Sequence, residues 1–258
     1  MRFTILLAAA LASTSPALAT VAAASQPAAA ADAAWPQRLQ IATQLVDLIH
    51  RDEELLQANL LGWESAVRTV LQKDPTVVKL EADFPGLTDA GVAAGRPLAI
   101  EYLRPFVVKS KAAKAEIFAR RMSIDELQQA KQFIGSAVGQ RFIQRAKASI
   151  DIGKLNSELT ERSLQTGSKF ATIEDSDRLV RDAARQATKD TSGQDLLAIM
   201  KFERTPVAKK LREATREAEK AVLEMANNPP AEWVARQNEA VSAAMIAFAE
   251  RKGGLPTQ

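Results

Sequence analysis

The chain has 258 residues, of which 34 are lysine or arginine, 31 are aspartate or glutamate, one is histidine and none is cysteine. Without cysteine there can be no disulfide, no thiolate nucleophile and no cysteine-ligated zinc or iron–sulfur site. The single histidine, His50, excludes every site that needs two imidazoles. A hydrophobic fraction of 47% and a charged fraction of 25% are typical of a globular protein rather than a disordered one.

The first residues have the pattern of a secretory signal peptide. Arg2 supplies the positive charge, residues 3–11 are apolar, and residues 17–19 (Ala-Leu-Ala) form a small-x-small cleavage site, with a second such site at residues 22–24. The apolar run is well short of the ~20 residues that a bilayer span needs. We therefore expect residues 1–19 to be removed and the protein to be exported, periplasmic and soluble after cleavage, with no transmembrane helix. Losing Arg2 lowers the formal net charge from +3 to +2, which gives no reason to expect nucleic-acid binding.

After the signal peptide, an Ala-rich stretch at residues 20–35 is expected to be a flexible tether. From residue 36 the spacing of apolar residues predicts one helix after another. The exception is Asp83 to Pro97, where three glycines and two prolines predict a long loop. A helix over residues 98–122 should follow, with a kink at Pro105. The further predicted helices cover residues 123–134, 137–165, 172–189, 192–203, 205–226 and 231–251.

No segment alternates with period two for long, and nearly every predicted helix has an apolar stripe. These features predict an all-α protein, a helical bundle of about eight helices built from helix–turn–helix units after a signal peptide. We expect a first helical domain at residues 36–165, a second helical unit at residues 166–252 and a tail at residues 253–258.

A helix–turn–helix motif recurs in the two units. In the first copy Ser123 and Glu126 have the spacing of a capping box, and Phe133 precedes a turn at which a second serine can cap the next helix. Shared positions in the second copy carry the same or similar residues, and chance similarity between two helical hairpins remains the alternative to a divergent repeat. The motif residues are Ser123, Glu126, Leu127, Phe133, Ser136 and Gly139 in the first copy, and Ser192, Asp195, Phe202, Thr205 and Pro206 in the second.

The first copy carries a family resemblance. Residues 122–127 are Met-Ser-Ile-Asp-Glu-Leu and residues 133–141 are Phe-Ile-Gly-Ser-Ala-Val-Gly-Gln-Arg. Together with the preceding helix, the segment at about residues 98–150 resembles domain of unknown function 2059, a family of exported bacterial proteins. That family's motif runs roughly Phe-Thr-x-x-Glu-Leu and then Phe-Tyr-x-Ser-Pro-x-Gly-Gln-Lys. Ile134 and Ala137 depart from it. The resemblance implies an all-α exported protein and no catalytic residue.

Motifs that carry chemistry are not found in the sequence. It has no G-x-S-x-G or S-x-x-K string and no glycine-rich phosphate loop, so we assign no catalytic residue, cofactor or metal ligand. His50 is expected on the surface among acidic residues. A calcium loop that begins at Asp175 is rejected, because Leu179 and Val180 stand where a ligand and a glycine are needed.

Two features point to binding. Lys109, Lys111 and Lys114 concentrate positive charge and form a candidate contact for an anionic envelope polymer, although a solvated helix face has the same pattern. Trp35, Trp63 and Trp233 form either an apolar ligand cavity or part of the core.

The leading hypothesis is a non-enzymatic interaction or scaffold module of the cell envelope, whose partner is an envelope protein or an anionic polymer. The alternatives are a carrier of a small apolar ligand between helices and a hydrolase that uses a carboxylate pair. An exposed apolar patch would favour the first, an apolar cavity the second, and two facing carboxylates in a cleft the third. The sequence does not predict the oligomeric state.

Overall fold

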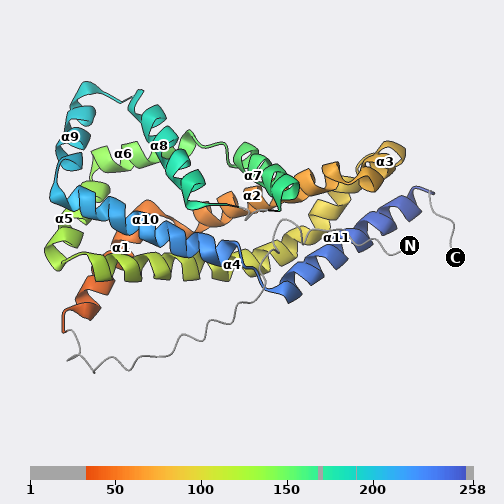
Figure 1. The fold of residues 1–258 in the computed structure, drawn as a ribbon, viewed down its shortest axis with the longest axis horizontal. Coiled ribbons are helices and arrows are strands. Elements are labelled where there is room, and N and C mark those ends of the chain that lie inside the picture. The colour runs from red at the N-terminus through yellow and green to blue at the C-terminus, as the bar shows by residue number, and fades with distance from the viewer. Residues whose placement is uncertain (1–32, 168–170, 190, 254–258) are drawn as a thin grey trace.

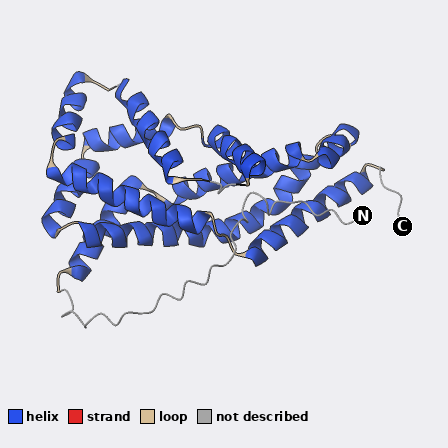
Figure 2. Ribbon diagram, in the orientation of Figure 1, coloured by secondary structure: helices blue, strands red, loops and turns tan. Residues whose placement is uncertain are grey.

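The structure, a computed structural model, describes residues 33–167, 171–189 and 191–253. These residues form eleven α-helices and no strand (Figure 2), so the all-α prediction is confirmed while the expected number of about eight helices is too low. The helices are α1 (Trp35–Ile49), α2 (Asp52–Lys73), α3 (Pro75–Asp83), α4 (Leu87–Arg121), α5 (Ile124–Gly135), α6 (Ala137–Ala148), α7 (Ile152–Thr166), α8 (Ile173–Lys189), α9 (Gly193–Glu203), α10 (Pro206–Ala226) and α11 (Ala231–Arg251).

The predicted signal peptide at residues 1–19, most of the tether at residues 20–35 and nearly all of the tail at residues 253–258 lie outside the described residues. The last residue assigned to the tether, Trp35, is instead the first residue of α1. Among the described helices, none is both long enough and apolar enough to cross a membrane.

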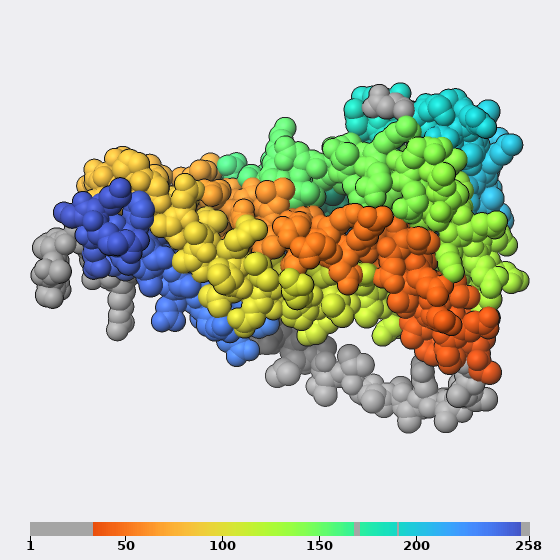
Figure 3. Space-filling view, turned by 180° about the vertical axis from the view of Figure 1, so that it is seen from behind, coloured from red at the N-terminus to blue at the C-terminus, as the bar shows by residue number. Residues whose placement is uncertain are grey.

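The central element is α4, a helix of 35 residues that is about 52 Å long at the usual rise per residue. In Figure 1 it runs along the long axis of the molecule, with α11 beside its amino-terminal half and α10 beside its carboxy-terminal half. The opposite face, seen in Figure 3, shows α1 and α2 laid along α4. Helices from both predicted units therefore pack on the same helix.

Three apolar clusters make up the core, and α4 contributes to each. The first joins the carboxy-terminal end of α4 to α1, α5 and α10. The second joins its amino-terminal end to α2, α3 and α11, and the third joins its middle to α2. This division follows from the length of α4, because one helix of that length meets different partners along its course.

The long loop predicted from Asp83 to Pro97 is wrong. The break between α3 and α4 is short, and α4 continues through both of its internal prolines. Gly91 and Gly95 lie one turn apart on the face that meets α11. A Cβ on Gly91 would lie 3.0 Å from the side chain of Met245, and a Cβ on Gly95 would lie 2.9 Å from Gln237 Oε1. These glycines bring two helices close together rather than ending one.

The predicted helix at residues 137–165 is also wrong in part, because the chain forms two helices there. The break lies at residues 149–151, where the Asp151 side chain accepts a hydrogen bond from the Lys154 amide at 2.9 Å and so caps α7. An aspartate at this position satisfies an amide that would otherwise lack a partner. This extra break contributes to the larger number of helices.

The hydroxyl-capped turns of both motifs are confirmed. Ser123 and Glu126 form the capping box, with the Glu126 carboxylate accepting from the Ser123 amide at 2.8 Å. The other three caps place a serine or threonine oxygen on the amide three residues later: Ser136 on Gly139, Ser192 on Asp195, and Thr205 on Ala208. Pro206 follows the last cap at the first helical position, where its missing N–H has no partner to lose.

The two motifs also pack against each other. Phe133 stacks on Phe202 with ring centroids 3.9 Å apart and planes 7° apart. Both rings are half-buried, and Phe202 packs against the first cluster. The copies are offset by 69 residues, as the positions of these two phenylalanines show. Two equivalent positions thus meet face to face.

Ion pairs also join equivalent positions of the two motifs. Arg141 of the first motif binds Asp195 of the second through two hydrogen bonds of 2.9 and 2.7 Å. The equivalent positions with the roles exchanged are Lys210 and Glu126, which also form an ion pair, at 2.6 Å. An arrangement in which residue i meets j and j meets i is that of an approximate two-fold contact.

Candidate functional site

An apolar cavity of about 430 Å³ lies between the helices. Its lining comes from six of them, α2, α4, α7, α8, α10 and α11. The volume falls within the range of about 300–1,000 Å³ in which small-molecule sites are found. Because these helices are far apart in the sequence, only the folded chain forms the cavity.

One face of α2 forms the longest wall of the cavity. The lining residues there recur every three or four positions from Leu55 to Val70, a distance of roughly 22 Å along a helix. In the middle of this wall, Gly62 lets α7 approach closely, because a Cβ there would lie 2.8 Å from Asn156 Nδ2.

Aromatic rings line the opposite side. Tyr102 on α4 stacks on Trp233 of α11, with centroids 4.3 Å apart and planes inclined by 26°, and Phe106 lies 6.1 Å from Tyr102. The Trp233 indole N–H donates to the Leu98 carbonyl at 3.1 Å, which fixes its ring. Burial raises the pKa of the Tyr102 hydroxyl, as expected where the charged form would lose its water.

The tryptophans identified from the sequence separate into two groups. Trp63 and Trp233 line the cavity, whereas Trp35 packs at the edge of the first cluster, where Arg38 lies over its ring at 5.8 Å. The structure thus brings together two of the three tryptophans that the cavity hypothesis required.

Three polar side chains belong to the lining: Asn59, Asn156 and Glu219. Asn59 donates its side-chain N–H to the Leu55 carbonyl at 2.7 Å, and Asn156 donates to the Ile152 carbonyl at 2.9 Å. One oxygen of Glu219 accepts from Lys114 Nζ at 2.7 Å.

The lysines proposed for an anionic surface have different surroundings. Lys109 is exposed. Lys111 pairs with Asp47 at 2.7 Å and also with Asp52. The Lys114 side chain is only 8% exposed and pairs with Glu219. Lys109, Lys111 and Lys114 therefore do not share one exposed cationic face, and two of them are joined to carboxylates.

His50 was expected on the surface beside acidic residues, and this is wrong. It is half-buried, and its Nε2 lies 3.3 Å from Lys114 Nζ. Burial, together with the charges of Lys114, Lys147 and Lys111, lowers the pKa of His50 to about 3. A neutral imidazole thus lies next to Lys114, the partner of the cavity residue Glu219.

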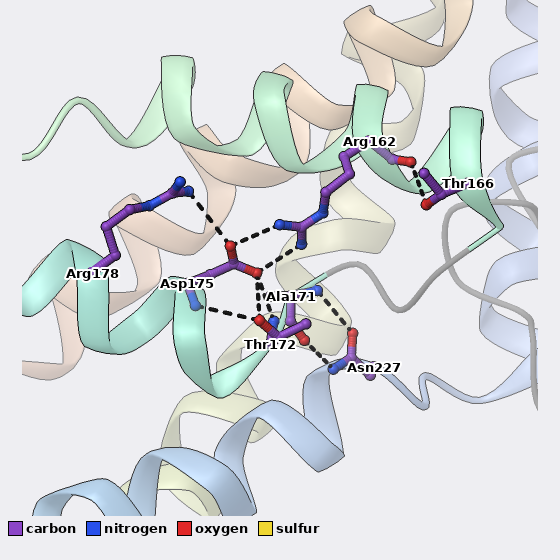
Figure 4. Close-up of polar contacts among 7 residues, drawn as sticks. All are labelled: Arg162, Thr166, Ala171, Thr172, Asp175, Arg178 and Asn227. Atoms are coloured by element: carbon purple, nitrogen blue, oxygen red, sulfur yellow. Dashed lines mark hydrogen bonds and ion pairs between the residues drawn. The ribbon is translucent and has the colours of Figure 1, made fainter.

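A polar cluster holds α8 against the rest of the cavity wall (Figure 4). Arg162 of α7 donates twice to the Asp175 carboxylate, each time at 2.7 Å, and the Thr172 amide donates to the same carboxylate at 2.9 Å. The Arg162 guanidinium and these hydrogen bonds hold the pKa of Asp175 well below its usual range. Asp175 is therefore a structural ion-pair partner that positions α8, which contributes Leu179 to the cavity.

The start of this helix is also tied to α10. The Asn227 side chain, at the end of α10, donates to the Ala171 carbonyl at 2.9 Å and accepts from the Ala171 amide at 3.3 Å (Figure 4). Together with the Asp175 cluster, these bonds hold α8 in place. None of the residues that form them lines the cavity itself.

A second hollow lies between α4, α8 and α10 and is lined mainly by charged side chains. Most of its cations have carboxylate partners: Arg121 pairs with Glu217 at 2.6 Å, Arg216 with Asp177 at 3.0 Å and Lys210 with Glu126 at 2.6 Å. It offers less binding potential than the apolar cavity, because most of its positive charges are paired within the chain. Within the described ranges, no cluster of three or more acidic or histidine side chains could hold a metal ion.

Large apolar side chains that are exposed do not gather in one place on the described part of the chain. They are spread over α2, α3, α4, α8, α9 and α11. Single exposed apolar residues are normal on protein surfaces. The residues are Leu61, Val78, Val108, Val180, Leu197, Met200 and Ile246.

Comparisons with protein families, with curated proteins and with solved structures find no match for this chain. The resemblance to domain of unknown function 2059 remains a prediction from the residues at about 98–150.

Sequence reasoning missed the polar residues of the cavity. Asn59 and Glu219 lie on helices that are far apart in the chain, and nothing local distinguishes them from surface residues. One sequence feature was available for the wall itself, namely the small residues Ala58, Gly62 and Ala66 at four-residue spacing. Such a stripe lies on one face of a helix and lets a neighbouring helix approach, as α7 does at Gly62.

Proposed function

We propose that this protein binds a small apolar ligand in the cavity between α2, α4, α7, α8, α10 and α11. The observation that carries the proposal is an apolar space of about 430 Å³ whose lining includes Trp63, Trp233, Tyr102 and Phe106. Pockets of this kind, with a few polar groups among aromatic and aliphatic side chains, are the usual form of small-molecule sites.

The other two hypotheses have less support in the described residues. A hydrolase with a carboxylate pair needs two facing acids, and Glu219 is the sole acid among the residues that line the cavity. An interaction module would be favoured by a continuous exposed apolar patch, whereas the exposed apolar residues are dispersed. As part of the same proposal, we place ligand binding in the periplasm, because the first residues have the pattern of a signal peptide.

The test is a fluorescence titration of the whole mature chain with decanol, a neutral apolar probe. In a Trp35→Phe variant the remaining tryptophans, Trp63 and Trp233, both line the cavity, so binding should change their emission saturably.

Filling the cavity supplies the control. Ala66→Phe adds a ring to the α2 wall and should abolish the saturable change, whereas Ala112→Phe, at an exposed position of α4, should leave it intact. Emission that stays constant up to the solubility limit of decanol would refute the proposal.

A further inference from the structure

The polar lining of the cavity includes side-chain oxygens that receive no hydrogen bond. Asn59 and Asn156 each donate to a backbone carbonyl, and since a carbonyl can only accept, the amide nitrogens must face it. The side-chain oxygens are then left as acceptors. One oxygen of the Glu219 carboxylate accepts a hydrogen bond from Lys114. In the part of the chain that the structure describes, neither the other Glu219 oxygen nor either asparagine oxygen has a hydrogen-bond donor.

The indole donors near the cavity are not free to bind a ligand. Trp233 Nε1 donates to Leu98. Trp63 Nε1 has no partner among the described residues, but it is fully buried and so does not face the open space. The Tyr102 hydroxyl can donate or accept. Each asparagine amide keeps a second N–H, but the one formal charge among the lining residues is the carboxylate of Glu219. Its partner Lys114 does not belong to the lining.

The aromatic lining favours the same kind of ligand. The rings of Trp63, Tyr102, Phe106 and Trp233 line the space, and aromatic faces attract cations as well as apolar groups. A carboxylate, by contrast, carries a negative charge and would be repelled by the charge of Glu219. A ligand with an ammonium group satisfies both the free acceptors and the rings.

The rest of the lining is mainly apolar, and α2 contributes the largest share of it. We propose that the cavity selects apolar molecules that carry a primary amine, with the ammonium group at Glu219 and the apolar part beside α2. This inference rests on the proposed function and names its ligand class.

The test compares three probes of equal chain length on the intact mature chain: decylamine, decanol and decanoate. Dissociation constants are measured by the same tryptophan fluorescence. We expect decylamine to bind at least tenfold more tightly than decanol, and decanoate to bind most weakly. Equal affinities, or decanoate binding as tightly as decylamine, would overturn the amine proposal while leaving the apolar cavity in place. If none of the three binds, the proposed function itself is wrong.

Variants locate the ammonium site. Glu219→Gln keeps the size of the side chain and should remove most of the preference for decylamine over decanol. Glu217→Gln is the matched control, because Glu217 lies on the same helix and pairs with Arg121 outside the cavity. An undiminished preference in Glu219→Gln would contradict the assignment.

Glu219→Gln leaves the buried Lys114 without its carboxylate partner. A second variant therefore tests the same assignment in case the first does not fold. Lys114→Gln removes the countercharge instead and should strengthen decylamine binding by several fold without strengthening decanol binding. Weaker decylamine binding in this variant, with the fold intact by circular dichroism, would count against the proposal.

Discussion

The motif end of the molecule and the cavity end differ in how their polar groups are satisfied. Where the two helix–turn–helix motifs meet, two ion pairs join them, Arg141–Asp195 and Lys210–Glu126. In the cavity, Asn59, Asn156 and Glu219 use only part of their bonding capacity. Because these three side chains are only partly buried, their unused oxygens remain available to a ligand.

The largest expected effect comes from a substitution that disturbs the close packing of the motif end. A Cβ on Gly139 would lie 2.3 Å from the Phe133 carbonyl oxygen, and backbone atoms cannot move aside as a side chain can. We expect Gly139→Ala to cost about 3 kcal/mol or more of unfolding free energy, in the range of severe overpacking.

The matched control for this substitution is Gly153→Ala, also within a helix, where the nearest atom to the new Cβ is 3.5 Å away. It should be neutral or slightly stabilising, because alanine favours helix more than glycine does. Urea denaturation of both variants measures the difference. Equal stability of the two would show that the motif end is not tightly packed.

A pH titration of stability tests the border of the cavity. The folded-state pKa of His50 is lowered to about 3 from an ordinary value of 6.5, so between these values the unfolded chain takes up a proton that the folded chain does not. Stability should therefore fall as the pH drops below about 6.5. The loss attributable to His50 at pH 5 is about 2 kcal/mol.

Comparing wild type with His50→Gln at pH 8 and pH 5 isolates this contribution from that of the carboxylates, because glutamine does not titrate. The variant should lose less stability on acidification than the wild type. Identical losses would mean that His50 is not buried beside Lys114.

The smallest expected effect concerns the capping box. Ser123→Ala removes an acceptor for the Glu126 amide and should cost about 1 kcal/mol, the usual cost of losing a helix cap. Thermal unfolding followed by circular dichroism is sensitive enough to detect it. A change near zero would show that the Glu126 carboxylate alone holds the start of α5.

The sequence predicted the motif end better than the cavity end for a physical reason. A cap such as Ser123 with Glu126 involves residues three positions apart, so its pattern is visible without the fold. The glycines at positions 91 and 95 gave a wrong prediction of a loop, because glycine can break a helix but also permits close packing, here against α11. The pairing of Glu219 with Lys114 joins residues far apart in the chain, and no local pattern encodes it.

The length of α4 has a consequence for how the molecule comes apart. All three apolar clusters include residues of this one helix. Unfolding at either end of the molecule therefore exposes buried surface of α4. Elements that share buried surface in this way tend to melt together rather than as separate cooperative units. Despite its extended outline, the protein should behave as a single cooperative unit on heating.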